Sequence, residues 1–302
     1  MNERPMHPST LSRRRALALL ASAPMAACTH ANGSSVAVGS KNFTEELVLG
    51  EMYAQRLERA RLPVVRKLNL GGTQVAMEAL QRGDIDLYPE YTGTALITEL
   101  KLHPTSSGTE IYRTVKAAYA QRYQLVWLDP APMNDTQALA TTAAISQRYR
   151  ATTLSQLSGV ASQLRLGAIP EFTKREDGLP GLQRAYGRFR FKEVRLFDIG
   201  LKYKALESGQ VDVVVAFGTD GQIAADKLIV FVDDKHFWPV YQVAPVVRRG
   251  ALERHPAIAG ALNPVAPLLT DAVMRGLNEK VDDEGQEPAD VARTFLTAHG
   301  LS

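Results

Sequence analysis

Two aromatic residues, Tyr91 and Phe217, occupy the same place in two copies of one sequence pattern. The pattern is Ala-Leu-x-x-Gly-x-x-Asp followed by an apolar residue, and it begins at Ala79 and again at Ala205. It predicts a helix that ends at a glycine, then a buried strand with the aromatic residue at its carboxyl end. Ligands of open α/β proteins bind at this end of the strands. The repeat therefore predicts two similar lobes that each offer an aromatic ring to a shared cleft, although helix–glycine–strand units also match by coincidence.

The signatures of common enzyme sites are absent from the sequence. It contains no phosphate-binding loop, no nucleophile elbow, no metalloprotease helix motif and no dinucleotide-binding glycine motif. The six histidines are scattered, and the single cysteine, Cys28, excludes a thiolate metal site and an intrachain disulfide. We therefore expect no catalytic residues, no metal and no cofactor.

Residues 1–27 have the features of an export signal. Arg13, Arg14 and Arg15 precede an apolar run that is too short to span a bilayer. Small residues then stand before Cys28, as in lipoprotein signals whose cysteine becomes the lipidated first residue. Plain cleavage near Ala27 is the alternative, and the arginines are also a weak feature of twin-arginine export. We expect a periplasmic protein that contacts the membrane only through a lipid on Cys28.

Removal of this signal changes the charge balance. The chain of 302 residues has 35 basic and 32 acidic residues. Residues 1–27 hold four Arg and one Glu, so the remainder carries 31 basic and 31 acidic residues and no net charge. The exported protein therefore has no electrostatic signature of nucleic-acid binding.

The rest of the sequence alternates between strand and helix patterns, which predicts an α/β fold. Asn42, with Glu45 three residues later, predicts a capping box for the first helix. Gly83 is expected just after a helix, and Pro89 is expected to end the strand 85–88 because it cannot donate to a ladder. Further strands are expected at 36–39, 64–70, 124–128, 137–144, 164–168, 194–197, 211–217 and 227–232.

Two proline-marked segments, near 129–132 and 238–247, predict that the chain crosses between lobes twice. The first lobe is then discontinuous. We expect an export signal in 1–27, a linker in 28–35, lobe 1 in 36–133 and 242–302, and lobe 2 in 134–241. Lobes joined in this way can close on a ligand by a hinge.

Several motifs, in order, resemble the substrate-binding proteins of osmoprotectant ABC importers, which take up glycine betaine, choline and carnitine. The motifs are Gly39-Ser-Lys-Asn-Phe-Thr-Glu, Leu70-Gly-Gly-Thr, Asp86-Leu-Tyr-Pro-Glu-Tyr-Thr-Gly-Thr, Asp177-Gly-Leu-Pro-Gly, Thr219-Asp-Gly and Asp233-Asp-Lys. The resemblance covers nearly all of the chain after the signal. It implies a type II periplasmic-binding-protein fold, with two α/β lobes, a two-stranded hinge and a central ligand cleft.

The resemblance also implies a binding site. Family members hold the trimethylammonium group of the ligand in an aromatic cage, because this group has no N–H to donate and ring faces are its best partners. Tyr91, Phe217 and Tyr241 match cage positions, and Gln137 stands where the family more often has Tyr.

A betaine also has a carboxylate. Lys41 and Thr94 match positions that contact this anionic end in family members, and Arg175 could bind it bidentately. Alternatively, Arg175 is a solvated loop charge or forms a salt bridge across the cleft.

The resemblance implies an extracytoplasmic monomer that captures a small quaternary amine and delivers it to a membrane permease driven by a separate ATPase. One alternative ligand is another betaine-like compound such as ergothioneine, with Gln137 donating a hydrogen bond. From other classes, the alternatives are an enzyme on the same bilobal fold and a sensory module.

Overall fold

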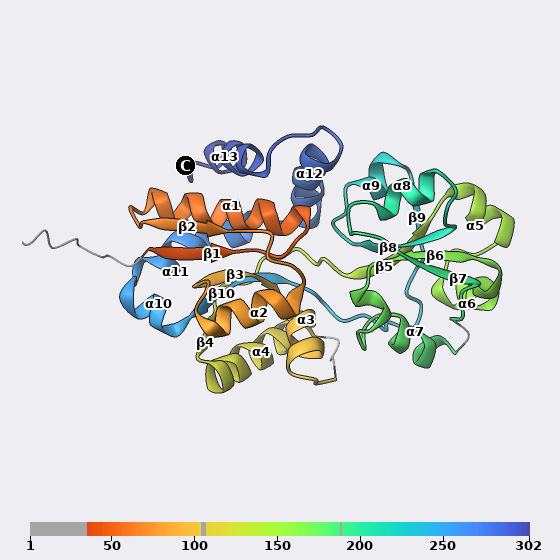
Figure 1. The fold of residues 1–302 in the computed structure, drawn as a ribbon, viewed down its shortest axis with the longest axis horizontal. Helices are drawn as coiled ribbons and strands as arrows, with labels where there is room; N and C mark the ends of the chain where they lie inside the picture. The colour runs from red at the N-terminus through yellow and green to blue at the C-terminus, as the bar shows by residue number, and fades with distance from the viewer. Residues whose placement is uncertain (1–34, 104–106, 188) are drawn as a thin grey trace, which may run out of the picture. The chain divides into compact units, whose positions relative to one another are not determined.

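The computed structural model describes residues 35–103, 107–187 and 189–302 (Figure 1). The expected export signal and Cys28 lie outside these residues. The described chain contains two five-stranded sheets with helices around each sheet, so the α/β class expected from the sequence is confirmed.

The first sheet has the strand order β2-β1-β3-β10-β4. Strands β1 and β2 are parallel, β1 and β3 are parallel, and β10 runs antiparallel to both β3 and β4. Its strands are β1 (Val36–Gly39), β2 (Val64–Lys67), β3 (Leu87–Tyr91), β4 (Leu125–Trp127) and β10 (Val243–Arg248). We call the part of the chain built on this sheet lobe 1.

The second sheet repeats this topology with the order β7-β6-β8-β5-β9. Strand β6 is parallel to β7 and β8, and β5 runs antiparallel to β8 and β9. Its strands are β5 (Gln137–Thr141), β6 (Arg165–Ala168), β7 (Glu193–Leu196), β8 (Val213–Phe217) and β9 (Ile229–Val230). We call the part built on this sheet lobe 2.

Helices pack on both faces of each sheet, so each lobe has two apolar layers. In lobe 1 they are α1 (Thr44–Arg59), α2 (Thr73–Arg82), α3 (Thr92–Thr94), a π-helical turn (Ala95–Glu99), α4 (Gly108–Tyr123), α10 (Arg249–Arg254), α11 (Ala257–Leu262), a 3₁₀ segment (Asn263–Leu268), α12 (Asp271–Asp282) and α13 (Pro288–Ala298). In lobe 2 they are α5 (Ala143–Tyr149), α6 (Leu154–Val160), α7 (Leu179–Tyr186), α8 (Lys202–Glu207), α9 (Gln222–Ala225) and two 3₁₀ turns (Ala161–Gln163 and Glu171–Thr173).

The internal repeat forms the same local structure in both lobes. Gly83 and Gly209 have φ angles of +81° and +68°, a left-handed conformation that glycine adopts at little cost. Three residues later the aspartates act alike, because the Asp86 carboxylate accepts from the backbone of Ala37 at 3.0 Å and the Asp212 carboxylate accepts from that of Arg165 at 2.8 Å. Each aspartate thus links its strand to the neighbouring parallel strand by a hydrogen bond.

The capping box predicted for the first helix is wrong. Helix α1 begins at Thr44, its N-cap is Phe43, and no side chain caps it. The Glu45 side chain does not turn back toward the Asn42 backbone, because it bonds to Tyr91, Thr219 and Asn278 instead. A residue expected to serve local helix structure therefore serves long-range contacts.

The prediction that Pro89 ends its strand is also wrong. Strand β3 continues to Tyr91, and Pro89 lies opposite Pro245 of β10. Thr92 and Gln242 face each other three positions further along, and the Thr92 amide donates to the Gln242 carbonyl. Hydrogen-bonded and non-hydrogen-bonded pairs alternate along antiparallel strands, so the two prolines form a non-hydrogen-bonded pair. The pairing of β3 with β10 needs no N–H from either proline, so both residues fit inside the ladder.

The two segments that join the lobes pair with each other. The Ala131 amide donates to the Val243 carbonyl at 2.8 Å, and the Asp135 amide donates to the Tyr241 carbonyl at 3.2 Å. The C-terminal region adds a third element, because the Asn134 amide donates to Asp271 at the start of α12 at 2.7 Å. The hinge is therefore two-stranded, as expected, and is supported by α12.

Within the described residues, no single helix is long and apolar enough to cross a membrane. One pair of segments, Ala257–Leu268 with Asp271–Asp282, meets the length and composition together but is bent by 97°.

Candidate ligand-binding site

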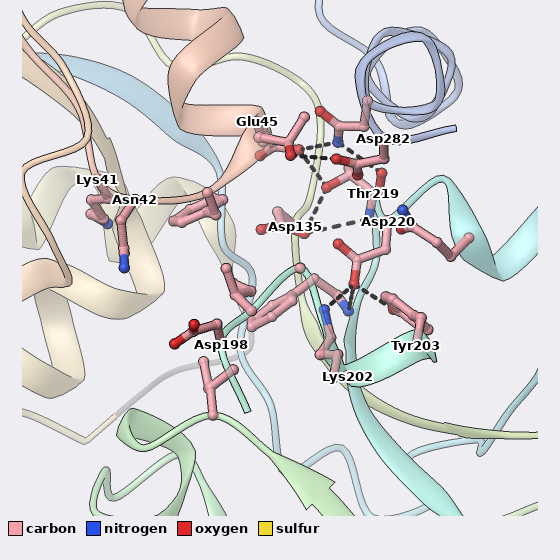
Figure 2. A pocket seen from close by; sticks show the side chains of 18 of the residues that line it. Lys41, Asn42, Glu45, Asp135, Asp198, Lys202, Tyr203, Thr219, Asp220 and Asp282 are labelled. Atoms are coloured by element: carbon pink, nitrogen blue, oxygen red, sulfur yellow. Dashed lines mark hydrogen bonds and ion pairs between the residues drawn. The ribbon is translucent and has the colours of Figure 1, made fainter. Parts of the chain in front are cut away.

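A pocket of about 580 Å³ is lined by residues of both lobes and of the hinge. This volume is in the range typical of small-molecule sites, about 300–1,000 Å³. All seven residues expected from the sequence to bind the ligand line it: Lys41, Tyr91, Thr94, Gln137, Arg175, Phe217 and Tyr241. Figure 2 shows the side of the pocket that contains Lys41, Glu45, Asp135 and Lys202.

In lobe 1, Tyr91 stands at the end of β3 and is almost fully buried. Its hydroxyl donates to Glu45 at 2.7 Å, and its ring stacks on Phe43 with centroids 6.2 Å apart. The Lys41 ammonium lies 4.8 Å from the ring centroid. Tyr91 is thus held from three sides, which fixes the orientation of its ring.

In lobe 2, Phe217 stands at the end of β8 and is half-buried. The Lys202 ammonium lies 5.1 Å from its ring centroid and 3.1 Å from the Asp220 carboxylate. Asp220 also accepts from the Tyr203 hydroxyl and from the Phe217 amide. The aromatic residue of each lobe therefore already has a lysine of the chain beside its ring.

Lys41 is buried and forms an ion pair with Glu90, with Nζ and Oε1 2.6 Å apart. Glu90 is further held by the Tyr88 hydroxyl at 2.6 Å. A second carboxyl, Glu46, lies 3.8 Å from the Lys41 ammonium, and burial raises the pKa of Glu46 to about 8. Glu90 is thus the close partner of the Lys41 ammonium, and Glu46 is a more distant partner whose pKa is raised by burial.

Asp177 joins three of the expected binding residues. Its carboxylate accepts two hydrogen bonds from Arg175, at 2.7 and 2.5 Å, and one from the Tyr241 hydroxyl at 2.6 Å. Its backbone carbonyl accepts from Gln137 Nε2 at 3.2 Å. Arg175 Nη2 also donates to Thr94 across the lobes at 3.3 Å. Arg175 is therefore no solvated loop charge: it is paired within lobe 2 and touches lobe 1.

The ring of Tyr241 packs directly on the backbone of Gly93. A Cβ atom at this position would lie 2.6 Å from the ring, so only glycine allows the approach. Gln137 lies next to Tyr241, with its Nε2 3.5 Å from the tyrosine hydroxyl, and pairs with Phe217 in the sheet. Gln137 of β5 and Tyr241 of the hinge thus bring an amide and a phenol to the same wall as the ring of Phe217.

Acidic side chains outnumber basic ones around the pocket. The lining includes four basic residues, Lys41, Arg175, Lys202 and Lys204. It includes nine acidic residues: Glu45, Asp135, Glu171, Asp198, Glu207, Asp220, Asp226, Asp282 and Asp283. This surplus favours a ligand that carries positive charge. In the part of the chain that the structure describes, no group of three or more His, Cys, Asp or Glu side chains could hold a metal ion.

Sequence reasoning missed several residues of this pocket, chiefly Glu45, Asp135, Lys202 and Asn278. Asp135 is two positions before Gln137, and Thr219 and Asp220 stand in a motif that carries the family resemblance, so their place in the chain was an available signal. Lys202 and Asn278 lie in ordinary helical sequence, which gave no signal of a role in the pocket.

Comparison with known proteins agrees with this geometry. The family described as the substrate-binding domain of ABC-type glycine betaine transport systems matches residues 34–298. The chain belongs to this family. Proteins of this family work outside the cytoplasm with an ABC permease, and the family is one of transport proteins rather than enzymes.

Individual members of the family are similar along most of the chain. It is 35% identical to a glycine-betaine-binding protein of Pseudomonas aeruginosa, with 93% of each chain covered. It is 36% identical over 87% of its length to an ergothioneine transport permease/ergothioneine binding protein of Helicobacter pylori, of which it spans 47%.

Solved structures show the same fold. A glycine betaine/carnitine/choline ABC transporter structure has a TM-score of 0.72 at 30% identity, and the match covers 88% of this chain and 99% of that one. The ligand-free glycine betaine-binding protein YehZ of Escherichia coli has a TM-score of 0.66 at 33% identity, with 89% and 100% covered. The two-lobed binding-protein fold expected from the sequence is confirmed.

Proposed function

We propose that this protein captures glycine betaine or a related quaternary-ammonium solute outside the cytoplasm and delivers it to an ABC permease. The observation that carries the proposal is the composition of one pocket, where the rings of Tyr91, Phe217 and Tyr241 lie among nine acidic and four basic side chains. Ring faces and carboxylates are the groups that attract a cation without hydrogen-bond donors.

The cationic head of the ligand would contact these three rings. Each ring contributes roughly 0.5–2 kcal/mol to binding, more when the contact excludes water. Tyr91 and Tyr241 are almost fully buried, which favours the upper part of this range, and Phe217 is half-buried. Lys41 and Lys202 reduce the attraction at Tyr91 and Phe217, because their ammonium groups already lie near those rings.

The carboxylate of a betaine would lie near Arg175 and Thr94. Among the described residues, Arg175 donates to Asp177 and Thr94 through Nε and Nη2, which leaves Nη1 for a ligand oxygen. Lys41 is the third candidate from the sequence; both cations are paired, Lys41 with Glu90 and Arg175 with Asp177, but the Lys41 side chain is 4% exposed whereas that of Arg175 is 19% exposed. We therefore assign the main carboxylate contact to Arg175 and give Lys41 a supporting role.

A second ligand class, ergothioneine, is favoured by Gln137. Ergothioneine carries the same trimethylammonium and carboxylate groups as glycine betaine, together with a polar thioimidazole ring. Gln137 places an amide in the wall where family members more often have Tyr, and such an amide can donate to a polar ring. The Helicobacter pylori relative, named for ergothioneine, gives this alternative independent support.

Calorimetry on the purified protein tests both proposals with a panel of glycine betaine, choline, carnitine, proline betaine and ergothioneine. At 100 times its Kd, a ligand should raise the free energy of unfolding by about 2.7 kcal/mol. A measurable heat of binding and a higher free energy of unfolding with at least one trimethylammonium compound would support the proposal. No binding by any of them would contradict it, and tightest binding of ergothioneine would favour the second ligand.

We propose that lobe 1 comprises residues 36–133 and 242–302 and that lobe 2 comprises residues 134–241, the division that the two sheets favour. The protein acts as a monomer. It returns its ligand chemically unchanged, and NMR of the released ligand would check this.

Cys28 carries the lipid anchor, so Cys28→Ala should move the exported protein from the membrane fraction to the soluble fraction.

A further inference from the structure

Thr219 of lobe 2 lies between two buried carboxyl groups. Its Oγ1 is 2.5 Å from Glu45 Oε2 and 2.7 Å from Asp135 Oδ1, and Figure 2 shows both contacts as dashed lines. All three residues are more than nine-tenths buried. A hydroxyl group has a single proton, so it donates to one of these oxygens and can only accept from the other. A carboxyl oxygen that donates must itself carry a proton.

We propose that Glu45 and Asp135 form a binding site for one proton, and that this proton fastens lobe 2 to lobe 1 through Thr219. In the protonated arrangement one carboxyl donates to Thr219, and Thr219 donates to the other. Without the proton, the Thr219 hydroxyl donates to only one carboxylate, and two negative charges face each other. If it donates to Glu45, Asp135 keeps, among the described residues, only the longer bond from the Thr219 amide at 3.3 Å. The site is independent of the identity of the transported ligand.

The contact joins parts of the chain that the hinge would separate. Glu45 is in the first turn of α1 in lobe 1, whereas Thr219 follows β8 in lobe 2. Asn278 of α12 supports the same junction, because its side-chain amide donates to Glu45 at 3.1 Å and to the Thr219 carbonyl at 3.0 Å. Arg275 donates to the Gly218 carbonyl at 2.9 Å. These neutral or cationic contacts hold the backbone of the loop, while the carboxyl pair carries the proton.

Among the described residues, no cation forms an ion pair with Glu45 or Asp135. Tyr91 donates to Glu45 at 2.7 Å, and Asp220 adds negative charge near both carboxyls. Lys202 pairs with Asp220 at 3.1 Å, and Arg275 donates to the backbone carbonyl of Gly218, so in the part of the chain that the structure describes neither cation pairs with Glu45 or Asp135. The other titratable or charged groups facing the pair are Glu46 and Tyr53 of α1, Tyr203 of α8, and Arg275 and Asp282 of α12.

Burial supports this assignment and sets the direction of its pH dependence. It raises the pKa of Glu45 to about 7 and that of Asp135 well above its usual range. If the lobes separate, both carboxyls regain water and ionise at their ordinary values near pH 4. Forming the junction therefore takes up a proton, so the junction is favoured at low pH and weakens as pH rises through about 7.

Distance measurements between the lobes test the proposal without any ligand. Spin labels at Arg59→Cys in lobe 1 and Lys192→Cys in lobe 2, in a Cys28→Ser background, would report lobe separation between about pH 5.5 and 8.5. We expect the mean distance to lengthen as pH rises toward about 7 and to change little above that value. Glu45→Gln replaces the protonated acid with an amide that needs no proton, so its distance should stay short across this range.

Asp135→Asn is the second variant, because an amide there also removes the need for the shared proton and should abolish the transition. Asp198→Asn is the matched control, since Asp198 lines the same pocket outside the pair and its loss should leave the transition intact. A pH-independent distance in the wild type would overturn the proposal. So would an unchanged transition in both Glu45→Gln and Asp135→Asn.

Discussion

Replacing Gln137 with tyrosine should tighten the binding of glycine betaine about tenfold. Gln137 is 5% exposed and pairs with Phe217 in the sheet, so a ring at this position would be shielded from water and close to an existing ring of the proposed cage. One added cation–π contact at about 1.4 kcal/mol corresponds to a tenfold change in Kd.

The same substitution has a cost in stability that must be kept apart from affinity. It removes the hydrogen bond from Gln137 Nε2 to the Asp177 carbonyl, which is 3.2 Å long and contributes about 1 kcal/mol to folding. This bond is formed in the protein without ligand, so its loss should appear in urea denaturation more than in the Kd.

Calorimetry with glycine betaine on the wild type, Gln137→Tyr and Gln137→Leu separates these effects. Gln137→Leu loses the amide without gaining a ring, so both variants should unfold more easily but only Gln137→Tyr should bind more tightly. Equal affinities for the two variants would refute the reasoning and place residue 137 outside the cage.

Three further variants test the charges around the pocket. Lys41→Met leaves Glu90 buried without its partner at 2.6 Å, so the free energy of unfolding should fall by about 3–5 kcal/mol, and a loss below 1 kcal/mol in urea denaturation would show that this pair is unimportant. Lys202→Met removes the ammonium beside Phe217, so choline should bind roughly fivefold tighter by calorimetry, and weaker binding would mean that Lys202 contacts the ligand. Burial raises the pKa of Glu46 to about 8, so folding takes up a proton and the free energy of unfolding of the wild type should decline from about pH 4.5 to 8. Glu46→Gln should flatten this decline. An identical pH profile of stability for the variant would contradict the assignment.

Local sequence patterns predicted most of the elements that position the pocket. The repeat through Gly83 and Gly209 located two equivalent strands, and both strands end at a pocket-lining aromatic residue, Tyr91 and Phe217. These predictions succeeded because a left-handed glycine and a buried apolar run are properties of a few neighbouring residues. The proline-marked crossings located the hinge, but residues 244–247 of the second one belong to strand β10 and not to the crossing.

Contacts between distant residues were not predictable in this way. The strand through Pro89 continues because its partner strand presents Pro245 at the facing position, which lies 156 residues away. Glu45 fits a local capping pattern, yet its carboxyl group bonds to Thr219, 174 residues further along the chain. The same holds for charge pairing, since nothing in the local sequence indicates that Lys41 pairs with Glu90, 49 residues away.

The central claim is that the pocket recognises a quaternary ammonium by its charge and not by its shape alone. Calorimetry with choline and with its neutral isostere, in which carbon replaces the nitrogen, isolates that charge because the two compounds have the same shape. If rings and surplus carboxylates attract the cation, the isostere should bind at least tenfold more weakly, a difference of about 1.4 kcal/mol or more. Equal affinities for the two compounds, or tighter binding of the isostere, would contradict the account.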